Sequence, residues 1–186
     1  DEDINVVNDG TSGNPIIFKS NVKQGAQVRG FNMNPAHHIV IDGFTISDTQ
    51  DENIYIHQDS SHVEIKNNYF YGIPGYSVYV EDNGAINDNF AQYVHIHDNI
   101  FNRTQYGFYA PLEHSILENN MIVNMVKYND GPDSDFIRFF GNNVTIRGNY
   151  LYMNQENYGD VCDSGYDFDS YGYDGDRCAH LDCFQT

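Results

Sequence analysis

Residues 63–70 read VEIKNNYF, a short alternating segment followed by a polar pair that ends in asparagine. The pattern returns downstream as VHIHDNIF (94–101), SILENNMI (115–122) and VTIRGNYL (144–151). The aligned asparagines are Asn68, Asn99, Asn120 and Asn149. An earlier copy, IVIDGFTI (39–46), keeps the alternation and lacks the asparagine. Copies recur at intervals of about 20 to 30 residues, which is typical of units that bury their apolar faces by stacking on one another.

The alternation within each copy predicts a short β-strand with one buried face. In the copy quoted first, Val63 and Ile65 lie on one face, and Glu64 and Lys66 lie on the other. Asparagine tolerates left-handed backbone angles, so we expect the aligned asparagine to turn the corner after the strand. Stacked amides also hydrogen-bond along their column. We therefore predict an all-β parallel β-helix with an inward asparagine ladder, and an Asn-rich β-sandwich is the alternative.

A second short strand precedes each copy, and its outward residues form the most function-like column of the sequence. The segments are NIYIH (53–57), SVYVE (77–81), GFYAP (107–111) and FIRFF (136–140), and LDCFQT (181–186) fits one more. Their central outward residues are Tyr55, Tyr79, Tyr109, Arg138 and Asp182. Neighbouring strands lie about 4.8 Å apart, so three stacked tyrosines should be followed by a cation and an acid. Sugar rings stack on aromatic faces, and the three tyrosines are therefore candidate glycan-binding residues.

The domain organisation follows from the distribution of the copies along the 186 residues. We expect β-helix coils over residues 1–155, an acidic loop rich in Gly, Tyr and Asp over 156–178, and the start of a further coil over 179–186. Neither end carries an amphipathic helix that would cover an open coil, so we expect the chain to continue beyond both ends or to stack end to end. No apolar run reaches the length of about 18 residues that crosses a bilayer, and we expect no membrane insertion.

The charge of the chain restricts its partners. It carries 27 acidic against 9 basic residues, a formal net charge of −18. This field repels nucleic acid backbones and anionic membranes, so neither is an expected partner. The densest acidic stretch, 156–176, suggests calcium as the candidate cofactor, because hard cations take several oxygen ligands. Its candidate ligands are Asp167, Asp169, Asp174 and Asp176. The spacing does not match the twelve-residue calcium loop, and a solvated surface loop is the alternative.

Cysteines and acceptor sequons favour an extracellular or cell-surface protein. Cys162 and Cys178 bracket the acidic loop, and a disulfide between them would close a long excursion. Cys183 is expected in the core, so the odd count leaves one thiol free or paired elsewhere. Asn102-Arg-Thr and Asn143-Val-Thr are two candidate N-glycosylation sites.

Seven of the eight histidines fall into three groups. Those at the entrance to a copy are expected to be turn residues: His37, His38, His62 and His114. His95 and His97 share the outward face of one strand and could bind a metal ion together, although the sequence fixes no acidic partner for them. His180 and Asp182 alternate outward with Arg138 one coil away, a set in which His or Asp could act as a base or acid and Arg could neutralise negative charge. The structural alternative is an Arg138–Asp182 ion pair.

These repeats, together with the opening NDGTSGNPIIFKS (8–20), resemble secreted right-handed parallel β-helix proteins of the pectate-lyase-like superfold. The ending HLDCFQT (180–186) is similar to a His-x-Asp-x-x-Gln motif of bacterial members that are thought to act on polysaccharides. The resemblance implies a right-handed helix and a glycan partner. Other family marks are absent: Tyr106-Gly-Phe-Tyr109 stands where an epimerase Asp-Pro-His motif is expected, and the paired aspartates of polygalacturonases are missing. A fold of this kind serves many activities.

Two functions follow as expectations. The first is an extracellular carbohydrate-binding or carbohydrate-processing protein of polysaccharide-lyase or glycoside-hydrolase type. A lyase would use Arg138 or calcium on a uronate carboxylate and His180 as base, whereas a hydrolase would use Asp182 with Asp135 as the nearest second carboxylate. The second is a non-catalytic β-solenoid subunit of an extracellular fibre, adhesin or appendage, which associates with itself end to end. Whether the protein is an enzyme is left open by its sequence.

Overall fold

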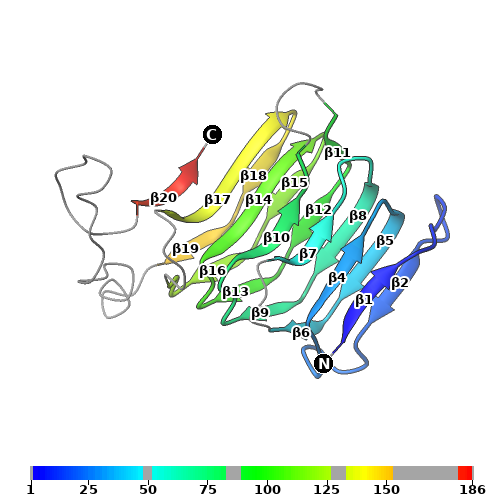
Figure 1. Ribbon diagram of the computed structural model, residues 1–186, viewed down its shortest axis with the longest axis horizontal. Helices are drawn as coiled ribbons and strands as arrows, with labels where there is room; N and C mark the ends of the chain where they lie inside the picture. Colours follow the sequence, from blue (N-terminus) through cyan, green and yellow to red (C-terminus); the bar gives the residue numbers. More distant parts are fainter. Residues whose placement is uncertain (1, 48–51, 83–88, 127–132, 153–179, 186) are drawn as a thin grey trace, which may run out of the picture.

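The computed structural model describes residues 2–47, 52–82, 89–126, 133–152 and 180–185. Over these residues the protein is all-β, with parallel strands in two sheets of 14 and 6 strands. Figure 1 shows the strands side by side in one stack, from β1 and β2 at the amino-terminal end to β17 and β20 at the other. The described part of the chain contains no helix suited to crossing a bilayer. The prediction of an all-β fold built from parallel strands is confirmed.

The strands fall into three parallel runs. The first comprises β1 (Asp3–Val6), β4 (Gly30–Met33), β7 (Glu52–Ile56), β10 (Tyr76–Val80), β14 (Tyr106–Glu113), β17 (Asp133–Asn142) and β20 (His180–Gln185). The second comprises β2 (Ile16–Lys19), β5 (His37–Asp42), β8 (Ser61–Lys66), β12 (His95–His97), β15 (Ile116–Glu118) and β18 (Thr145–Arg147). The short β11 (Ala91–Gln92) pairs with both β14 and β8 and joins these runs into the larger sheet.

The third run is the smaller sheet, and it comprises β3 (Ala26–Val28), β6 (Phe44–Ile46), β9 (Tyr69–Tyr71), β13 (Ile100–Asn102), β16 (Met121–Val123) and β19 (Tyr150–Tyr152). Along the chain, a strand of the first run is followed by one of the second and one of the third, for example β7, β8 and β9. Each strand then pairs with its counterpart from the next pass of the chain. This repeating path is consistent with a β-solenoid.

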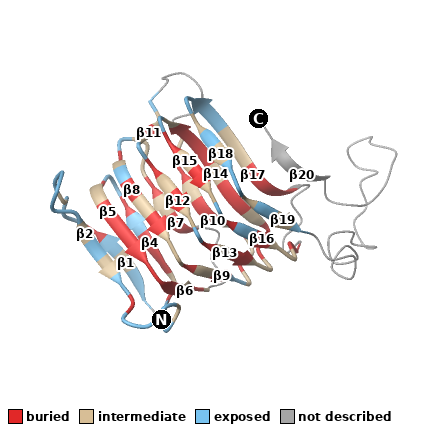
Figure 2. Ribbon diagram, turned by 180° about the vertical axis from the view of Figure 1, so that it is seen from behind, coloured by how far each residue is buried: buried red, intermediate tan, exposed pale blue. Residues whose placement is uncertain are grey.

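The core lies between the three runs and follows the predicted alternation. Val63 and Ile65 of β8 are buried, as are Ile54 and Ile56 of β7. Phe70 of β9 belongs to the same apolar cluster, so one core draws on all three runs. Figure 2 shows buried positions along successive strands across the stack.

The predicted asparagine ladder is present at the corner between the second and third runs. Each side-chain amide donates to the side-chain oxygen of the next member, with distances of 3.1, 3.0 and 3.0 Å from Asn68 through Asn99 and Asn120 to Asn149. The same oxygens accept the backbone N–H of the preceding member. The copy that lacks asparagine ends the ladder, because the backbone N–H of Phe44 donates to Asn68 Oδ1 at 2.9 Å.

The expectation that the ladder asparagine itself turns the corner is wrong. The left-handed backbone angle belongs to the residue before it: Asn67, Asp98, Asn119 and Gly148, with Gly43 in the earlier copy. Asn, Asp and Gly tolerate this conformation best. The two polar positions therefore have different roles. The first residue makes the bend, and the second points its side-chain amide into the core.

Candidate functional sites

The predicted tyrosine column is formed on β7, β10 and β14. The backbone register pairs Tyr55 with Tyr79 and Tyr79 with Tyr109. The ring centroids lie 6.1 and 5.1 Å apart, with interplanar angles of 24° and 18°. Both faces of the Tyr79 ring are therefore turned towards neighbouring rings. Tyr76 and Tyr106 add a second stacked pair beside the column, at 4.5 Å.

This mutual stacking changes what the column can do. A sugar that binds by stacking needs an open ring face, and the middle ring has none because its neighbours lie against both sides. The hydroxyl of Tyr109 donates a hydrogen bond to Asp82. Burial, together with this hydrogen bond, raises the pKa of Tyr109 well above its usual value. The middle of the column therefore has no open ring face, and the hydroxyl of Tyr109 is already engaged.

The predicted catalytic set meets the column at Arg138, but the backbone register separates its members. Arg138 pairs with Tyr109, as expected. On the other side it pairs with Gln185, whereas Asp182 pairs with Asp135. Asp182 and Gln185 are three positions apart, roughly 10 Å along a strand. The prediction that Asp182 follows Arg138 in one column is therefore wrong, and His180 lies still further along the strand, opposite Asp133.

The expected alternation and the observed backbone register also differ at the buried position of β17. The sequence alternation placed Cys183 inward, yet Phe184 pairs with Ile137, whose side chain is fully buried. Arg138 is meanwhile engaged by its own strand, since its Nε lies 2.9 Å from the fully buried carboxylate of Asp135. Arg138 therefore forms an ion pair with Asp135, whereas the Arg138–Asp182 ion pair of the structural alternative involves a side chain outside those that the structure describes.

The outer face of the third run carries an exposed apolar band that the sequence interpretation missed. The register aligns Tyr69, Ile100, Met121 and Tyr150 in one column and Tyr71, Asn102, Val123 and Tyr152 in the next. Four of these side chains are exposed to solvent: Tyr71 (44%), Met121 (42%), Tyr150 (55%) and Tyr152 (48%). We call these four residues the exposed band. The signal was available, because the two residues after each ladder asparagine alternate outward and inward.

Amide groups lie beside the exposed band. Asn124 donates to Asn102 Oδ1 at 3.0 Å, and Asn102 donates to the hydroxyl of Tyr69 at 3.1 Å. Asn102 is thus half-buried with its amide nitrogen engaged, and the threonine of its sequon, Thr104, is fully buried. The other sequon asparagine, Asn143, is exposed and adopts a left-handed backbone angle.

Histidines occupy the corner between the first and second runs. His38, His62 and His114 all have left-handed backbone angles, as does Tyr93, which takes the same place in the remaining copy. Consecutive rings stack at 4.5, 4.8 and 5.5 Å. Burial and the two histidines His38 and His37 lower the pKa of His62. The left-handed backbone angles agree with the predicted turn role for His38, His62 and His114, although His38 and His62 are second residues of β5 and β8. His37 begins β5, and its ring contacts Ser61.

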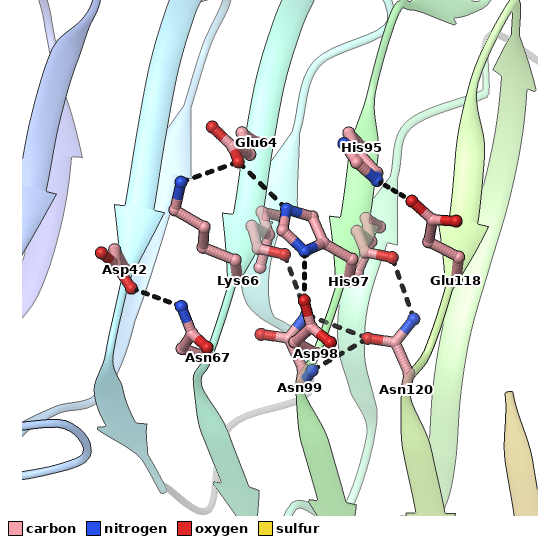
Figure 3. Close-up of polar contacts among 12 residues, drawn as sticks. Asp42, Glu64, Lys66, Asn67, His95, His97, Asp98, Asn99, Glu118 and Asn120 are labelled. Carbon is pink, nitrogen blue, oxygen red and sulfur yellow. Dashed lines mark hydrogen bonds and ion pairs between the residues drawn. The ribbon is translucent and has the colours of Figure 1, made fainter. Parts of the chain in front are cut away.

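The outward face of the second run brings together a polar cluster around His95 and His97 (Figure 3). The register sets His95 beside Glu64, and one ligand atom each of Glu64, His95 and His97 lies within 4.8 Å of the others. The acidic partner that the sequence did not fix is therefore Glu64, supplied by the preceding pass of the chain. His97 contacts Glu64 at 3.0 Å and Asp98 at 2.7 Å through its two ring nitrogens.

Several predicted site residues lie outside the described residues, among them the candidate calcium ligands Asp167, Asp169, Asp174 and Asp176 and the candidate disulfide Cys162–Cys178. The acidic loop over 156–178 lies there with them. His180, Asp182 and Cys183 are described through their backbone pairing in β20.

Comparison of the chain with protein-family models, curated proteins and solved structures found no match. The geometry of these surfaces therefore supports any functional proposal for the chain.

Proposed function

We propose that the chain is a right-handed parallel β-helix that acts outside the cell and binds a polysaccharide across its exposed band. The observation that carries the proposal is the exposure of Tyr71, Tyr150 and Tyr152 on the outer face of the third run. Large apolar patches on a soluble protein commonly mark binding sites. β9 and β19 are separated by three strand spacings, roughly 14 Å, so an extended chain of sugars could contact tyrosines at both ends.

The composition of the band suits a glycan. Tyrosine combines an apolar ring with a polar hydroxyl, and the amides of Asn102 and Asn124, which hydrogen-bond to one another, make the surface beside the band polar. The net charge of −18 repels polyanions, so a neutral polysaccharide is the favoured ligand over a uronate polymer.

We favour binding over lyase or hydrolase chemistry. Arg138, which would neutralise a sugar carboxylate, is held against the buried Asp135. Asp135 is itself fully buried and could not reach a bound polysaccharide as the second carboxylate of a hydrolase. The backbone register also keeps His180 and Asp182 away from Arg138.

The test is affinity electrophoresis in gels that contain one polysaccharide each, with neutral and uronate polymers in the panel. Tyr150→Ala and Tyr152→Ala should each weaken binding about tenfold, which corresponds to about 1.4 kcal/mol for one aromatic contact. Tyr93→Asn is the matched control, because Tyr93 is as exposed (49%) but lies in a turn outside the band. The proposal would be refuted if all three variants were retarded equally, or if no polymer retarded the wild-type protein.

The second candidate function is a non-catalytic subunit of an extracellular fibre or adhesin. It is favoured by the tyrosine column, whose rings stack on one another and so stabilise the succession of coils. Electron microscopy of the purified protein separates the two functions. Long unbranched filaments would favour the fibre and end-to-end self-association, whereas discrete particles that bind a polysaccharide would favour the glycan-binding protein.

A further inference from the structure

The polar cluster on β8, β12 and β15 lies on a different run from the exposed band and has its own chemistry. His95 and His97 are two residues apart on one outward strand face, and their ring centroids lie 4.1 Å apart. Glu64 lies on the neighbouring strand β8, in register with His95. The three side chains are partly exposed, so solvent and small ions reach them. We propose that Glu64, His95 and His97 bind a divalent transition-metal ion of the zinc or copper type.

The contacts of His97 support a cation at this position. Its Nδ1 lies 2.7 Å from a carboxylate oxygen of Asp98, and its Nε2 lies 3.0 Å from Glu64 Oε1. A neutral imidazole has one N–H and can donate to only one of two carboxylates. The second contact therefore turns a carboxylate oxygen towards a ring nitrogen, an arrangement that a metal ion between Nε2 and Glu64 would make favourable.

In each histidine, a carboxylate also contacts the ring nitrogen that would not bind the metal. Asp98 holds Nδ1 of His97, and Glu118 holds Nε2 of His95 at 2.8 Å. This leaves Nε2 of His97 and Nδ1 of His95, and Figure 3 shows the latter on the side that faces Glu64. A carboxylate that accepts from the outer N–H fixes the tautomer and strengthens the other nitrogen as a metal ligand.

The donor set selects the class of metal. Two imidazole nitrogens and one carboxylate oxygen suit zinc or copper, whereas calcium takes oxygen ligands almost exclusively. Three protein ligands leave a coordination position for water or another ligand. Zinc bonds of about 2.0–2.1 Å place the ligands of a tetrahedron roughly 3.4 Å apart. His97 Nε2 and Glu64 Oε1, now 3.0 Å apart, must therefore separate slightly, whereas ligand atoms up to 4.8 Å apart must approach by about 1.4 Å or less. Rotation of these partly exposed side chains provides that movement.

Lys66 is the competitor for the site. Its ammonium nitrogen lies 2.8 Å from the same Glu64 oxygen that faces His97. A bound metal ion must displace this ammonium group and would feel its positive charge. Removing the charge by Lys66→Gln should therefore tighten metal binding several-fold, an effect in the opposite direction to that of a lost ligand.

The experiment is isothermal titration of the untagged full chain with zinc chloride, repeated for variants. We expect one zinc ion per chain, loss of at least tenfold in affinity for His95→Gln, His97→Gln and Glu64→Gln, and a gain for Lys66→Gln. His62→Asn is the control, because His62 lies in the turn column and asparagine accepts its left-handed backbone angle. Its affinity should equal that of the wild type.

Copper(II) gives an independent readout of the ligands. Electron paramagnetic resonance of the one-to-one complex should show coupling to two imidazole nitrogens, reduced to one in His95→Gln or His97→Gln. Three results would overturn the proposal: no saturable zinc binding, binding that persists unchanged in His95→Gln and His97→Gln, or binding that is lost in His62→Asn. The second would assign the metal to the cysteines or acidic loop, and the third to the turn histidines.

Discussion

Replacing Asn99 by alanine should be among the most destabilising single changes in this chain. The side chain is almost fully buried and its carboxamide makes four hydrogen bonds. It donates to Ile65 O at 2.9 Å and to Asn120 Oδ1 at 3.0 Å. Its oxygen accepts from the backbone and side-chain nitrogens of Asn68 at 2.9 and 3.1 Å. Asn99→Ala removes all four bonds at once.

The magnitude follows from these four bonds. Each contributes a net of about 1 kcal/mol, and a buried group that loses its partner costs about 1–3 kcal/mol. The carbonyl of Ile65 and the backbone N–H of Asn68 both lose a partner in a region without water access. We therefore expect Asn99→Ala to lower the free energy of unfolding by about 4 kcal/mol, a large part of the roughly 5–15 kcal/mol typical of a domain.

Asn149→Ala is the matched comparison. Its carboxamide makes three hydrogen bonds, to Leu117 O and from the two nitrogens of Asn120. Asn149 is only half-buried, so water replaces part of what is lost, and we expect about 1–2 kcal/mol. Denaturant unfolding followed by circular dichroism measures both values, and hydrogen exchange of the Asn68 amide reports the local loss in Asn99→Ala. A cost for Asn99→Ala no greater than that for Asn149→Ala would refute the ladder as a buried, cooperative column.

Three further predictions test other parts of the chain. Phe101→Ala should cost about 3–5 kcal/mol in denaturant unfolding, because its fully buried ring stacks on Phe70 and meets the ring of Phe108 edge to face. Burial raises the pKa of Asp42, but the hydrogen bond from Asn67 and a lysine ion pair outweigh it and leave that pKa below its usual value. Its stabilisation is therefore full above the unfolded pKa of about 3.9 and fades as the pH falls through the lower folded pKa, so Asp42→Asn should destabilise by about 1 kcal/mol at pH 7 and progressively less as the pH falls through the folded pKa. In a eukaryotic secretory host, mass spectrometry should find glycan on the exposed Asn143 rather than on Asn102, whose amide is engaged.

Much of the stacking could be predicted from the sequence because the strand repeat is two residues and the coil repeat is marked. The ladder asparagines and the column of Tyr55, Tyr79 and Tyr109 follow from aligning the copies. The corner residue could not be assigned with the same certainty, because the pair Asn67-Asn68 offers two residues that both tolerate a left-handed angle. The two residues are distinguished only by which of their side-chain amides enters the core.

The failures have physical causes too. The last strand follows a long segment without a copy of the repeat, so alternation alone did not determine which of its residues pairs with Arg138, and the backbone register pairs Gln185 with it rather than Asp182. The cluster of Glu64, His95 and His97 could be predicted only in part. The strand pairing places Glu64 beside His95, but whether the side chains converge depends on rotamers that a sequence pattern does not specify.

The strand spacing of about 4.8 Å also indicates where function should be sought in this fold. When one residue type repeats down a column, its members satisfy one another: asparagine amides bond to asparagine amides, and the rings of Tyr55, Tyr79 and Tyr109 stack on rings. Such columns stabilise the coils and leave little unsatisfied chemistry for a ligand. A column of unlike residues does the opposite, as where His97 stands between Lys66 and Glu118. We therefore expect binding groups where a column contains unlike residues, as in the polar cluster around His95 and His97 and in the exposed band.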